Sequence, residues 1–508
     1  MVPIKTRLER KDPGMENLEN FEALFNPETA AVVGASDNLR KWGGGVFNSV
    51  LKSPPVKRAY PVNNRVAEVQ GVKAYPSVRD LPEPVDFVAI VIPFTDVLQV
   101  VQDCVARGVK AALIITAGLG ETGPEGARLQ EEITRTARAG GLRLNGPNCM
   151  GHFNATCGFS TVRMGMSIER GEISVISESG AFAGHILQCG SEMGVGFSKF
   201  VSTGNEADLH FEDFLEYLAQ DDETKVIAAY VEGLREGRRF FKLAKEITKK
   251  KPIVLVKVGR TEAGVRAAKS HTSAIAGSDV IYDAMFKQSG VIRVNEVEEI
   301  FDVASALLRQ PLPKGNKVGI LTFGGGFGCV ASDACEKLGL EVARLSPRTI
   351  ERLNEVLPER WPHANPVDMV GFGAPVYPCL WPMIEDDNLD SILVIGGIAQ
   401  AAMWRNRANR NNLSTIGQAD SAPSLLEEAE QAMKAQEEQE QKELEKLFEY
   451  MQKYKKPIYV FHNWADRIKD MPVFQQLKDN GIMTYSTPER AARVMSYMAS
   501  YGQYINSQ

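Results

Sequence analysis

The chain has 508 residues, a net charge of −6 and 44% hydrophobic residues, which excludes a one-domain binding module, a disordered chain and a coiled-coil rod. At about 100 to 200 residues per domain, the length predicts about three domains. The excess of acidic residues argues against a general nucleic-acid binder, because phosphate neutralisation needs clustered basic charge.

Neither targeting nor membrane insertion is expected. The N-terminal stretch MVPIKTRLERKDPGMENLEN lacks the apolar segment of a secretory signal, and the longest apolar runs fall short of the roughly 20 residues that span a bilayer. The seven cysteines are scattered, without the paired CxxC spacing of zinc sites. We therefore expect a cytoplasmic protein with reduced thiols, no metal site and no membrane or nucleic-acid partner.

From Glu28 onward, short apolar runs alternate with longer helix-like stretches, a pattern typical of α/β folds with parallel sheets covered by helices. In the first unit, these runs are AAVVG ending at Gly34, RAYPV around Tyr60, DFVAIVI before Pro93, AALIIT before Ala117 and RLNG before Pro147. Ligands bind beyond the carboxyl ends of parallel strands, so the turns that follow are expected to carry the chemistry.

The predicted domains are an N-terminal extension (1–20), a first domain (21–151), a second (152–310) and a third (311–508) with a charged helical insertion at about 403–455. The segment from Leu425, which lacks Gly and Pro, predicts a long helix. This helix would cover one sheet face or serve as a contact arm for a partner subunit.

A strand, a small-residue turn and a helix occur twice, about 145 residues apart, as SESGAFAG (177–184) and GGGFG (324–328). Helix N-termini carry unpaired N–H donors and partial positive charge, so they bind anions. Two related turns suggest that both helix ends face a single phosphoryl group. A serine-hydrolase elbow is disfavoured, because Ser177 replaces the glycine expected two residues before Ser179.

The first turn, VVGASDNLRKWGGG, is a second candidate phosphate site. It places Gly34, Ser36, Arg40 and Lys41 between a strand and a helix. The spacing is not GxGxxG, and a plain surface turn remains the alternative. Asn63 and Arg65 stand where an NAD enzyme usually presents an acidic residue to the ribose, which favours a phosphorylated ribose. Pro93, at the same sheet edge, is a further candidate for cofactor binding.

His271 is the most informative of the six histidines. It lies in VGRTEAGVRAAKSHTSAIAGSD, a segment of small residues that we expect to form a movable loop. Glu232 lies near the end of the run VIAAYVEG (226–233), at a strand terminus where sheet proteins place functional groups. If Glu232 accepts a hydrogen bond from one ring nitrogen of His271, the other nitrogen becomes a better nucleophile. A histidine with a purely structural role remains the alternative.

In this order, the motifs resemble the NDP-forming acyl-CoA synthetases, relatives of succinyl-CoA synthetase, and specifically the alpha subunits of ADP-forming acetyl-CoA synthetases. The resemblance covers nearly everything from about Phe21 and rests on stretches such as VVGASDNLRKWGG, GPNCMG, ISESGAFAG, KSHTSAIAGSD and ANPVDMVG. It implies a Rossmann-like CoA-binding domain followed by two flavodoxin-like ligase domains.

The resemblance also implies residue roles. His271 matches the histidine that becomes phosphorylated, and Glu232 matches the carboxylate that supports it. The two helix N-termini that hold the phosphate are matched by Ser179 and Gly180 and by Gly325, Gly326 and Gly328. In the family, acyl-CoA and phosphate give an acyl phosphate and CoA, and the histidine then passes the phosphoryl group to ADP.

The chain lacks a region with the pattern of an ATP-grasp nucleotide domain. The resemblance therefore implies a separate beta subunit that holds ADP or ATP and Mg²⁺, in an α2β2-type assembly that acts on a small carboxylic acid or acyl-CoA. The acyl pocket is expected from GPNCMGHFN (146–154), STGNEAD and GFGAPVYP (371–378), which leaves acetate, a branched acid or an aryl acid open.

The sequence departs from the family pattern at three places. Ser273, Ala274 and Ile275 replace the usual Gly, Ser and Leu after the histidine, TFGGGFG replaces TNAGGPG, and SESG replaces SQSG. The last change places Glu178 near the expected anion site. Two alternatives stay open: a non-catalytic CoA-binding scaffold or regulator, and an acyl or carbamoyl transferase. An NAD-dependent dehydrogenase is disfavoured by Arg65.

Overall fold

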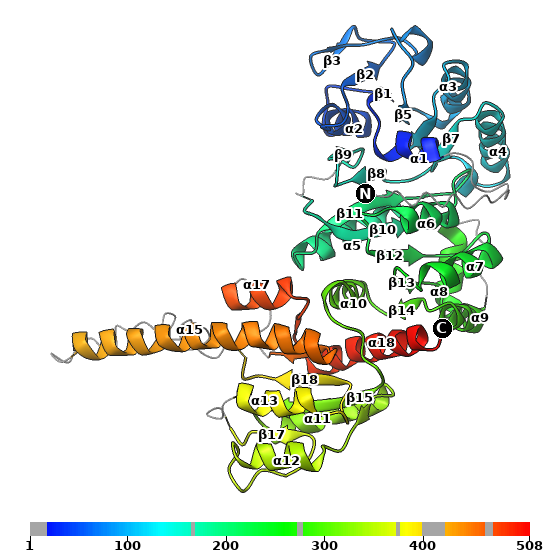
Figure 1. The fold of residues 1–508 in the computed structure, drawn as a ribbon. Coiled ribbons are helices and arrows are strands. Elements are labelled where there is room, and N and C mark those ends of the chain that lie inside the picture. The colour runs from blue at the N-terminus through cyan, green and yellow to red at the C-terminus, as the bar shows by residue number, and fades with distance from the viewer. Residues whose placement is uncertain (1–17, 164–167, 272–277, 372–375, 399–421, 463–470) are drawn as a thin grey trace, which may run out of the picture. The chain divides into compact units, whose positions relative to one another are not determined.

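The structure is a computed structural model that describes residues 18–163, 168–271, 278–371, 376–398, 422–462 and 471–508 (Figure 1). The chain divides into two compact units, Met1–Ile300 and Phe301–Gln508. Both units are built from mainly parallel sheets with helices between the strands, which confirms the predicted α/β class. Among the described residues, no helix combines the length and apolarity that crossing a membrane requires.

The first sheet has the strand order β2-β1-β5-β6-β7, and every neighbouring pair is parallel. Its strands are β1 (Thr29–Val33), β2 (Arg58–Val62), β5 (Phe87–Ile90), β6 (Ala111–Ile114) and β7 (Arg143–Asn145). Its other elements are α1 (Leu18–Phe25), α2 (Trp42–Leu51), α3 (Phe94–Ala106), α4 (Pro124–Ala139), the hairpin β3 (Glu68–Val69) and β4 (Val72–Lys73), η1 (Val78–Asp80) and η2 (Gly120–Thr122). Each of the five strands of this sheet lies on one of the five predicted apolar runs, whereas β3 and β4 lie on none of them.

Both faces of this sheet are buried. Ala30 and Val32 of β1 pack in one core with α1 and α2, whereas Ala31 and Val33 pack in a second core with α3 and α4. Successive side chains of a strand point to opposite faces, so a continuous apolar run is what a doubly covered strand requires.

The second sheet has the order β14-β13-β12-β10-β11-β8-β9 and is parallel except where β8 pairs with β11 and with β9. Its strands are β8 (His152–Asn154), β9 (Phe159–Ser160), β10 (Arg170–Ser177), β11 (Phe197–Ser202), β12 (Val226–Val231), β13 (Ile253–Lys257) and β14 (Ile292–Val294). Its helices are α5 (Gly180–Glu192), α6 (Phe211–Gln220), α7 (Gly237–Ile247), α8 (Glu262–His271), α9 (Asp279–Gln288) and α10 (Val297–Arg309).

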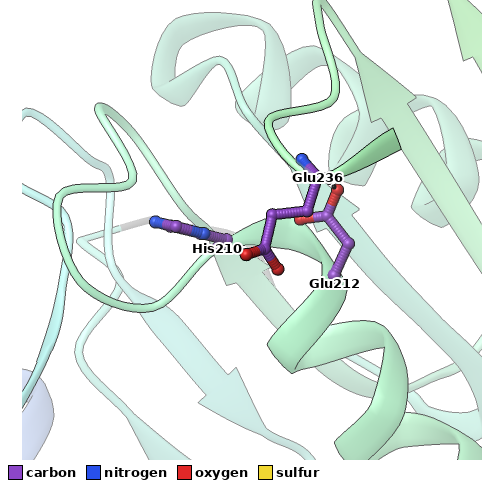
Figure 2. A group of neighbouring side chains, drawn as sticks. All are labelled: His210, Glu212 and Glu236. Atoms are coloured by element: carbon purple, nitrogen blue, oxygen red, sulfur yellow. Dashed lines mark hydrogen bonds between the residues drawn. The ribbon is translucent and has the colours of Figure 1, made fainter. Parts of the chain in front are cut away.

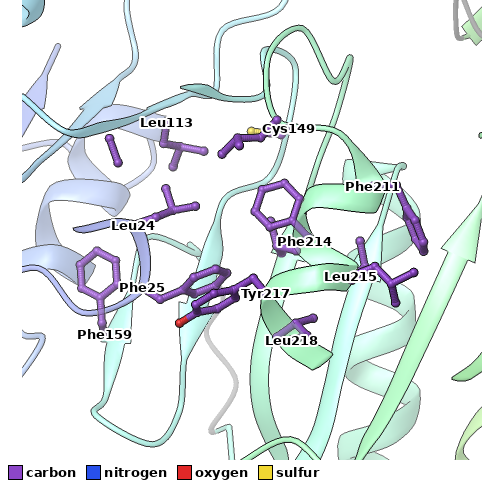
Figure 3. Packing of buried hydrophobic residues seen from close by; sticks show 14 of the residues in the cluster. Leu24, Phe25, Leu113, Cys149, Phe159, Phe211, Phe214, Leu215, Tyr217 and Leu218 are labelled. Carbon is purple, nitrogen blue, oxygen red and sulfur yellow. The ribbon is translucent and has the colours of Figure 1, made fainter. Parts of the chain in front are cut away.

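One apolar core joins the first and second sheets (Figure 3). Phe25 of α1 stacks on Tyr217 of α6, with ring centroids 5.1 Å apart and an interplanar angle of 3°. Phe214 of α6 and Leu113 of β6 belong to the same core. Because large buried aromatic side chains contribute strongly to packing, this core fixes the loops of the two sheets against each other.

The second unit contains a third sheet, in the order β16-β15-β18-β19-β20 with β17 beside β15. Its strands are β15 (Lys317–Thr322), β16 (Glu341–Val342), β17 (Val367–Asp368), β18 (Ser391–Ile395), β19 (Ile458–Phe461) and β20 (Thr484–Tyr485). Its helices are α11 (Gly325–Lys337), α12 (Pro347–Asn354), α13 (Val376–Glu385), α15 (Ala422–Tyr454), α17 (Pro472–Asp479) and α18 (Pro488–Asn506). The long charged helix predicted from Leu425 is confirmed as α15, which Figure 1 shows as one continuous helix.

The strand orders reveal a shared plan. In each sheet, the chain moves from the first parallel strand to a neighbour on one side and then crosses to the other side, which is the flavodoxin-like arrangement. Each sheet therefore has a switch point, where ligands bind, at the carboxyl ends of its two central strands. These strands are β1 and β5 in the first sheet, β10 and β12 in the second, and β15 and β18 in the third. The repeated strand, turn and helix predicted from the sequence are β10 with α5 and β15 with α11.

Candidate active site

A cavity of about 810 Å³ lies in the first unit, where the carboxyl ends of its two sheets meet. Its lining comes from the turns after β5 (Val91–Pro93), β6 (Ile115–Ala117) and β10 (Glu178–Ala181), from Asn148–Met150 and Gly204–Asn205, and from Trp42 and Glu232. A volume of this size is typical of small-molecule and cofactor sites. The two switch points of the first unit thus open into one chamber.

The N-terminus of α5 lines part of this cavity. Ser179 is the N-cap, with extended backbone angles (φ −95°, ψ 121°), and its hydroxyl accepts a hydrogen bond from the Phe182 N–H at 3.3 Å. Ser179 and Gly180 both line the cavity. The first N–H groups of a helix have no intrahelical partner and carry partial positive charge, so this end is suited to a phosphoryl group.

Glu232 directly follows β12 and also lines the cavity. Its carbonyl oxygen accepts a hydrogen bond from the Lys257 ammonium at 2.9 Å. This lysine is buried on β13, with its Nζ 4.5 Å from the centre of the Tyr282 ring. Glu232 and the Ser179 turn therefore lie on the wall of one cavity.

Glu178 is also part of the cavity wall, and its side chain is buried, with 6% exposure. Its Oε2 accepts hydrogen bonds from the backbone N–H groups of Glu232 and Gly233, at 2.8 and 2.9 Å. The carboxyl therefore links the end of β10 to the turn after β12. Burial, with the neighbouring Glu206 as a second cause, raises the pKa of Glu178 well above its usual range.

His271 is the last residue of α8. The stretch that precedes it was predicted as a loop of small residues, and this is wrong, because Glu262–His271 is helical. Alanine and charged residues in that stretch favour a helix more than its glycine disfavours one. The His271 side chain, and the departures at Ser273, Ala274 and Ile275, lie outside the described residues.

The predicted residues of the first turn divide into two groups. Pro93 lies in the cavity wall, whereas Gly34, Ser36, Arg40, Lys41, Asn63 and Arg65 are not among the lining residues. Gly34 has a positive φ of 87°, and a Cβ there would come within 2.1 Å of the Val91 carbonyl oxygen. Only glycine fits at that approach of the β1 turn to the β5 turn.

The basic pair of that turn is exposed at the edge of the cavity. Arg40 and Lys41 are both exposed, and Lys41 directly precedes Trp42, which lines the cavity. Nearby, the Asn63 amide donates to the Ala35 carbonyl at 2.9 Å. The Arg65 side chain is exposed, so the cationic groups of the first domain remain available to a ligand.

The second predicted anion site lies in the other unit. Gly324 is the N-cap of α11, and Gly325 and Gly326 are exposed in its first turn. Gly328 is buried, and a Cβ there would meet Thr322 Cγ2 at 3.2 Å and Pro366 Cβ at 3.3 Å. Packing therefore explains the glycine at position 328. Gly325 and Gly326 are exposed, so their backbone is accessible to a ligand.

Two of the three predicted acyl-pocket loops contribute to the cavity. These are the 146–154 loop, through Asn148–Met150, and the STGNEAD loop, through Gly204 and Asn205. Asn205 is held in place because its amide donates to Gln130 Oε1 at 3.0 Å and to Glu121 Oε2 at 2.5 Å. The third loop (371–378) belongs to the other unit, and its residues 372–375 lie outside the described residues.

Sequence reasoning missed two residues near the cavity. Trp42 is 43% exposed although it is a large aromatic residue, and its position directly after a basic pair was the available signal. Glu206 is buried beside the cavity residue Asn205, and burial, followed by the nearby charge of Glu212, raises its pKa to about 8. Its burial could not be read from STGNEAD, because acidic residues in loops are usually exposed.

A separate group of possible metal ligands consists of His210, Glu212 and Glu236, each of which offers an atom within 4.8 Å of the others (Figure 2). Arg239 pairs with Glu236 at 3.0 Å and with Asp213 at 2.8 Å. Arg239 thus pairs with one member of the group, Glu236, and we assign no metal to the three residues.

Two family models match the chain: a CoA-binding domain over residues 28–155 and a succinyl-CoA ligase-like flavodoxin domain over residues 170–307. The alpha subunit of ADP-forming acetate–CoA ligase II from Pyrococcus furiosus is 45% identical over 381 residues, covering 74% of this chain and 82% of that subunit. ADP-forming acetate–CoA ligase I from Archaeoglobus fulgidus is 41% identical over 377 residues, covering 74% of this chain and 54% of that protein. This chain therefore spans about half the length of the Archaeoglobus relative.

The similarity extends to a solved structure. The dinucleotide-forming acetyl-coenzyme A synthetase 1 of Ca. Korarchaeum cryptofilum, in complex with phosphate and ADP, aligns with a TM-score of 0.76 at 30% identity. The alignment covers 96% of this chain and 98% of that chain. The likeness thus includes the second unit as well as the two domains that the family models match.

Proposed function

Because this chain belongs to the family of ADP-forming acetate–CoA ligase alpha subunits, and so to the NDP-forming acyl-CoA synthetases, we propose that it carries the acyl-transfer and phosphohistidine steps of such an enzyme. The reaction interconverts acyl-CoA, ADP and phosphate with a carboxylic acid, CoA and ATP. It proceeds through an acyl phosphate and a phosphorylated His271.

The observation that carries this proposal is the single cavity that joins the turns of the first domain to the α5 N-terminus and Glu232. A phosphate oxygen attacks the thioester carbonyl, the carbon–sulfur bond breaks and CoA leaves as the thiol after taking up a proton. The N–H groups at Ser179 and Gly180 are positioned to stabilise the charge on the phosphoryl oxygens. Fixed donors of this kind need no reorganisation during the reaction.

In the second step, a ring nitrogen of His271 attacks the phosphorus of the acyl phosphate, and the carboxylate leaves. Glu232 acts by accepting a hydrogen bond from the other ring nitrogen, which orients the imidazole and makes it a better nucleophile. The terminal oxygen of ADP then attacks phosphorus, the phosphorus–nitrogen bond breaks and the histidine is regenerated. The position of Glu232 on the cavity wall supports this role.

We assign CoA to the first domain. The basic turn with Gly34, Ser36, Arg40 and Lys41 would bind its phosphate groups, with Asn63 and Arg65 toward the phosphorylated ribose, and Pro93 would border the thiol-bearing arm. Support comes from the CoA-binding model over residues 28–155 and from the exposed cations that precede the cavity residue Trp42. The exposed glycines Gly325 and Gly326 at the α11 N-terminus, together with Gly328, would provide the second phosphoryl site.

We further propose that a separate beta subunit of the ATP-grasp type binds ADP or ATP with Mg²⁺, in an α2β2-type assembly. The Pyrococcus relative is named as an alpha subunit, and this chain covers only 54% of the longer Archaeoglobus enzyme. Without such a partner, the chain is expected to bind CoA but not to form ATP.

The test is to incubate the chain and its beta subunit with labelled ATP and Mg²⁺ and to measure acid-labile, alkali-stable label. Wild type is expected to take up label, and His271→Ala to take up none. The matched control is His363→Ala, because His363 is exposed in the other unit. If properly paired wild-type protein binds CoA but takes up no label, the ligase proposal fails and a CoA-binding scaffold replaces it.

A further inference from the structure

One carboxyl group in the cavity wall, that of Glu178, has hydrogen bonds at only one of its two oxygens among the described residues. Glu178 Oε2 accepts two backbone hydrogen bonds, from Glu232 and Gly233. Its Oε1 is buried and has no hydrogen-bond partner among the described residues. A buried oxygen without a partner costs free energy, so this atom is expected to have a partner when the site is in use.

The surroundings of Glu178 disfavour a negative charge. Burial is the largest cause of its raised pKa, followed by the charge of Glu206, and Glu232 acts in the same direction. Lys257 interacts electrostatically with Glu178, but burial lowers the pKa of this lysine and its ammonium donates to the carbonyl oxygens of Glu232 and Val258.

The proposed function adds a further negative group to this site, because a phosphoryl group would lie at the α5 N-terminus, one residue from Glu178. Two carboxylates and a phosphoryl anion in one buried site repel one another strongly. A proton on Glu178 removes one of these charges and supplies a donor. Documented enzyme sites keep a buried carboxylic acid neutral near pH 7 for the same purpose.

Resting on the proposed function, we propose that Glu178 takes part in the reaction as a neutral carboxylic acid whose Oε1–H donates a hydrogen bond to the phosphoryl group at the α5 N-terminus. Its Oε2 stays bonded to the two backbone N–H groups, which fixes the direction of the donor. No covalent bond is made or broken at Glu178, because it donates a hydrogen bond to the phosphoryl group and is not itself phosphorylated.

This role links phosphate binding to pH. Because the folded-state pKa of Glu178 is raised, the donor is present at low pH and is lost as pH rises through that pKa. Binding that requires one proton then weakens by up to about tenfold per pH unit above the pKa. Glutamine at this position can accept the same backbone bonds through its oxygen and donate through its amide nitrogen at any pH.

The experiment measures KM for inorganic phosphate against pH in the acyl-CoA-consuming direction, with the chain paired to its beta subunit. In wild type, KM is expected to rise by about fivefold to tenfold per pH unit on the alkaline side. The ionisation of phosphate itself changes KM with pH equally in both proteins. Beyond that shared change, KM of Glu178→Gln is expected to stay constant with pH. Equal pH slopes in the two proteins would overturn the proposal.

Two further variants sharpen the test. Glu206→Gln removes a charge that raises the pKa of Glu178, so the rise in KM is expected to begin at lower pH. Glu299→Gln is the matched control, because Glu299 is also buried and its Oε2 also accepts a backbone hydrogen bond, from the Asn295 N–H at 2.9 Å, but it does not line the cavity. Its pH profile is expected to match wild type.

A direct measurement separates this inference from the proposed function. The infrared difference spectrum of the full chain, wild type against Glu178→Gln, is expected to show a protonated carboxyl band at neutral pH that disappears at higher pH. Its absence at neutral pH would overturn the inference even if His271 takes up label. If the protein shows the band but His271 takes up no label, the result contradicts the proposed function instead.

Discussion

The turn before α5 and the turn before α11 occupy the same place in their sheets and share one hydrogen-bond pattern. Ser177 Oγ donates to the carbonyl of the N-cap Ser179 at 2.9 Å, and Thr322 Oγ1 donates to the carbonyl of the N-cap Gly324, also at 2.9 Å. The hydroxyl at the strand end therefore sets the turn in both cases. The backbone at each helix end is suited to an anion, because the first N–H groups of a helix have no intrahelical partner.

The side chains make the two turns different. The first places the buried carboxyl of Glu178 and the capping hydroxyl of Ser179 at the α5 N-terminus. The second has Phe323, whose ring lies 5.3 Å from that of Phe327, and Gly324, which makes no side-chain cap. The first turn thus carries a titratable side chain of its own, whereas residues 322–328 of the second turn carry none, and the nearby carboxylate there comes from Asp368, whose Oδ2 would lie 3.1 Å from a Cβ at Gly325.

The sharpest test of this comparison removes one N–H donor from each turn. Gly180→Pro and Gly325→Pro replace the first helical residue, where proline is tolerated. The preceding residues, Ser179 and Gly324, already have the extended ψ values of 121° and 132° that proline requires. A hydrogen bond to a charged group is worth about 1.5–3 kcal/mol, so each variant is expected to slow His271 labelling by about 10- to 100-fold.

Alanine at the same two positions is the matched control. It adds a Cβ at similarly tight points, 3.3 Å from the Met150 nitrogen at Gly180 and 3.1 Å from Asp368 Oδ2 at Gly325, but it keeps the N–H. Labelling of the alanine variants is expected to stay much closer to wild type. If Gly325→Pro labels at the wild-type rate, the second turn does not hold the transferred phosphoryl group.

A second prediction concerns pH and stability in the unit with the buried acids. The pKa of Glu206 is raised from 4.5 to about 8 by burial, so the folded state binds a proton that the unfolded state has released. Its contribution to stability is present at low pH and is lost as pH rises toward 8. Between pH 5 and pH 8, the unfolding midpoint of the first unit is expected to fall less in Glu206→Gln than in wild type.

Thermal unfolding followed by calorimetry at several pH values measures this effect. The comparison is between the slopes of midpoint against pH, so a constant loss of stability caused by the substitution does not affect it. Parallel slopes for wild type and Glu206→Gln would show that Glu206 has the same pKa in the folded and unfolded states.

The smallest predicted effect concerns the two N-caps. Ser179→Ala removes the hydroxyl that accepts from Phe182 and is expected to cost about 1 kcal/mol. Gly324→Ser introduces a cap where the backbone is already extended and no atom lies within 4 Å of the new Cβ, so it is expected to add a few tenths of a kcal/mol. Denaturant unfolding of the full chain measures both, and a gain of stability in Ser179→Ala or a loss in Gly324→Ser would contradict the prediction.

The sequence by itself determined the α/β class, the strands of the first sheet, the long helix α15 and the repeated strand, turn and helix. It also identified the family, through an ordered set of short motifs that the comparisons confirm. These features are local. An apolar run bounded by turn residues predicts a strand, and glycine or serine directly after it predicts a helix N-terminus, wherever the rest of the chain lies.

Only the tertiary structure decided which turns share a cavity and which carboxyls are buried. Pro93, Ser179 and Glu232 come together because the aromatic core around Phe25 and Tyr217 joins the first two sheets. Glu178 was expected as a charge near an anion, and the fold instead buries it against the backbone of Glu232 and Gly233. Burial and neighbouring charge depend on segments far apart in the sequence, and they set the protonation state that the proposed chemistry uses.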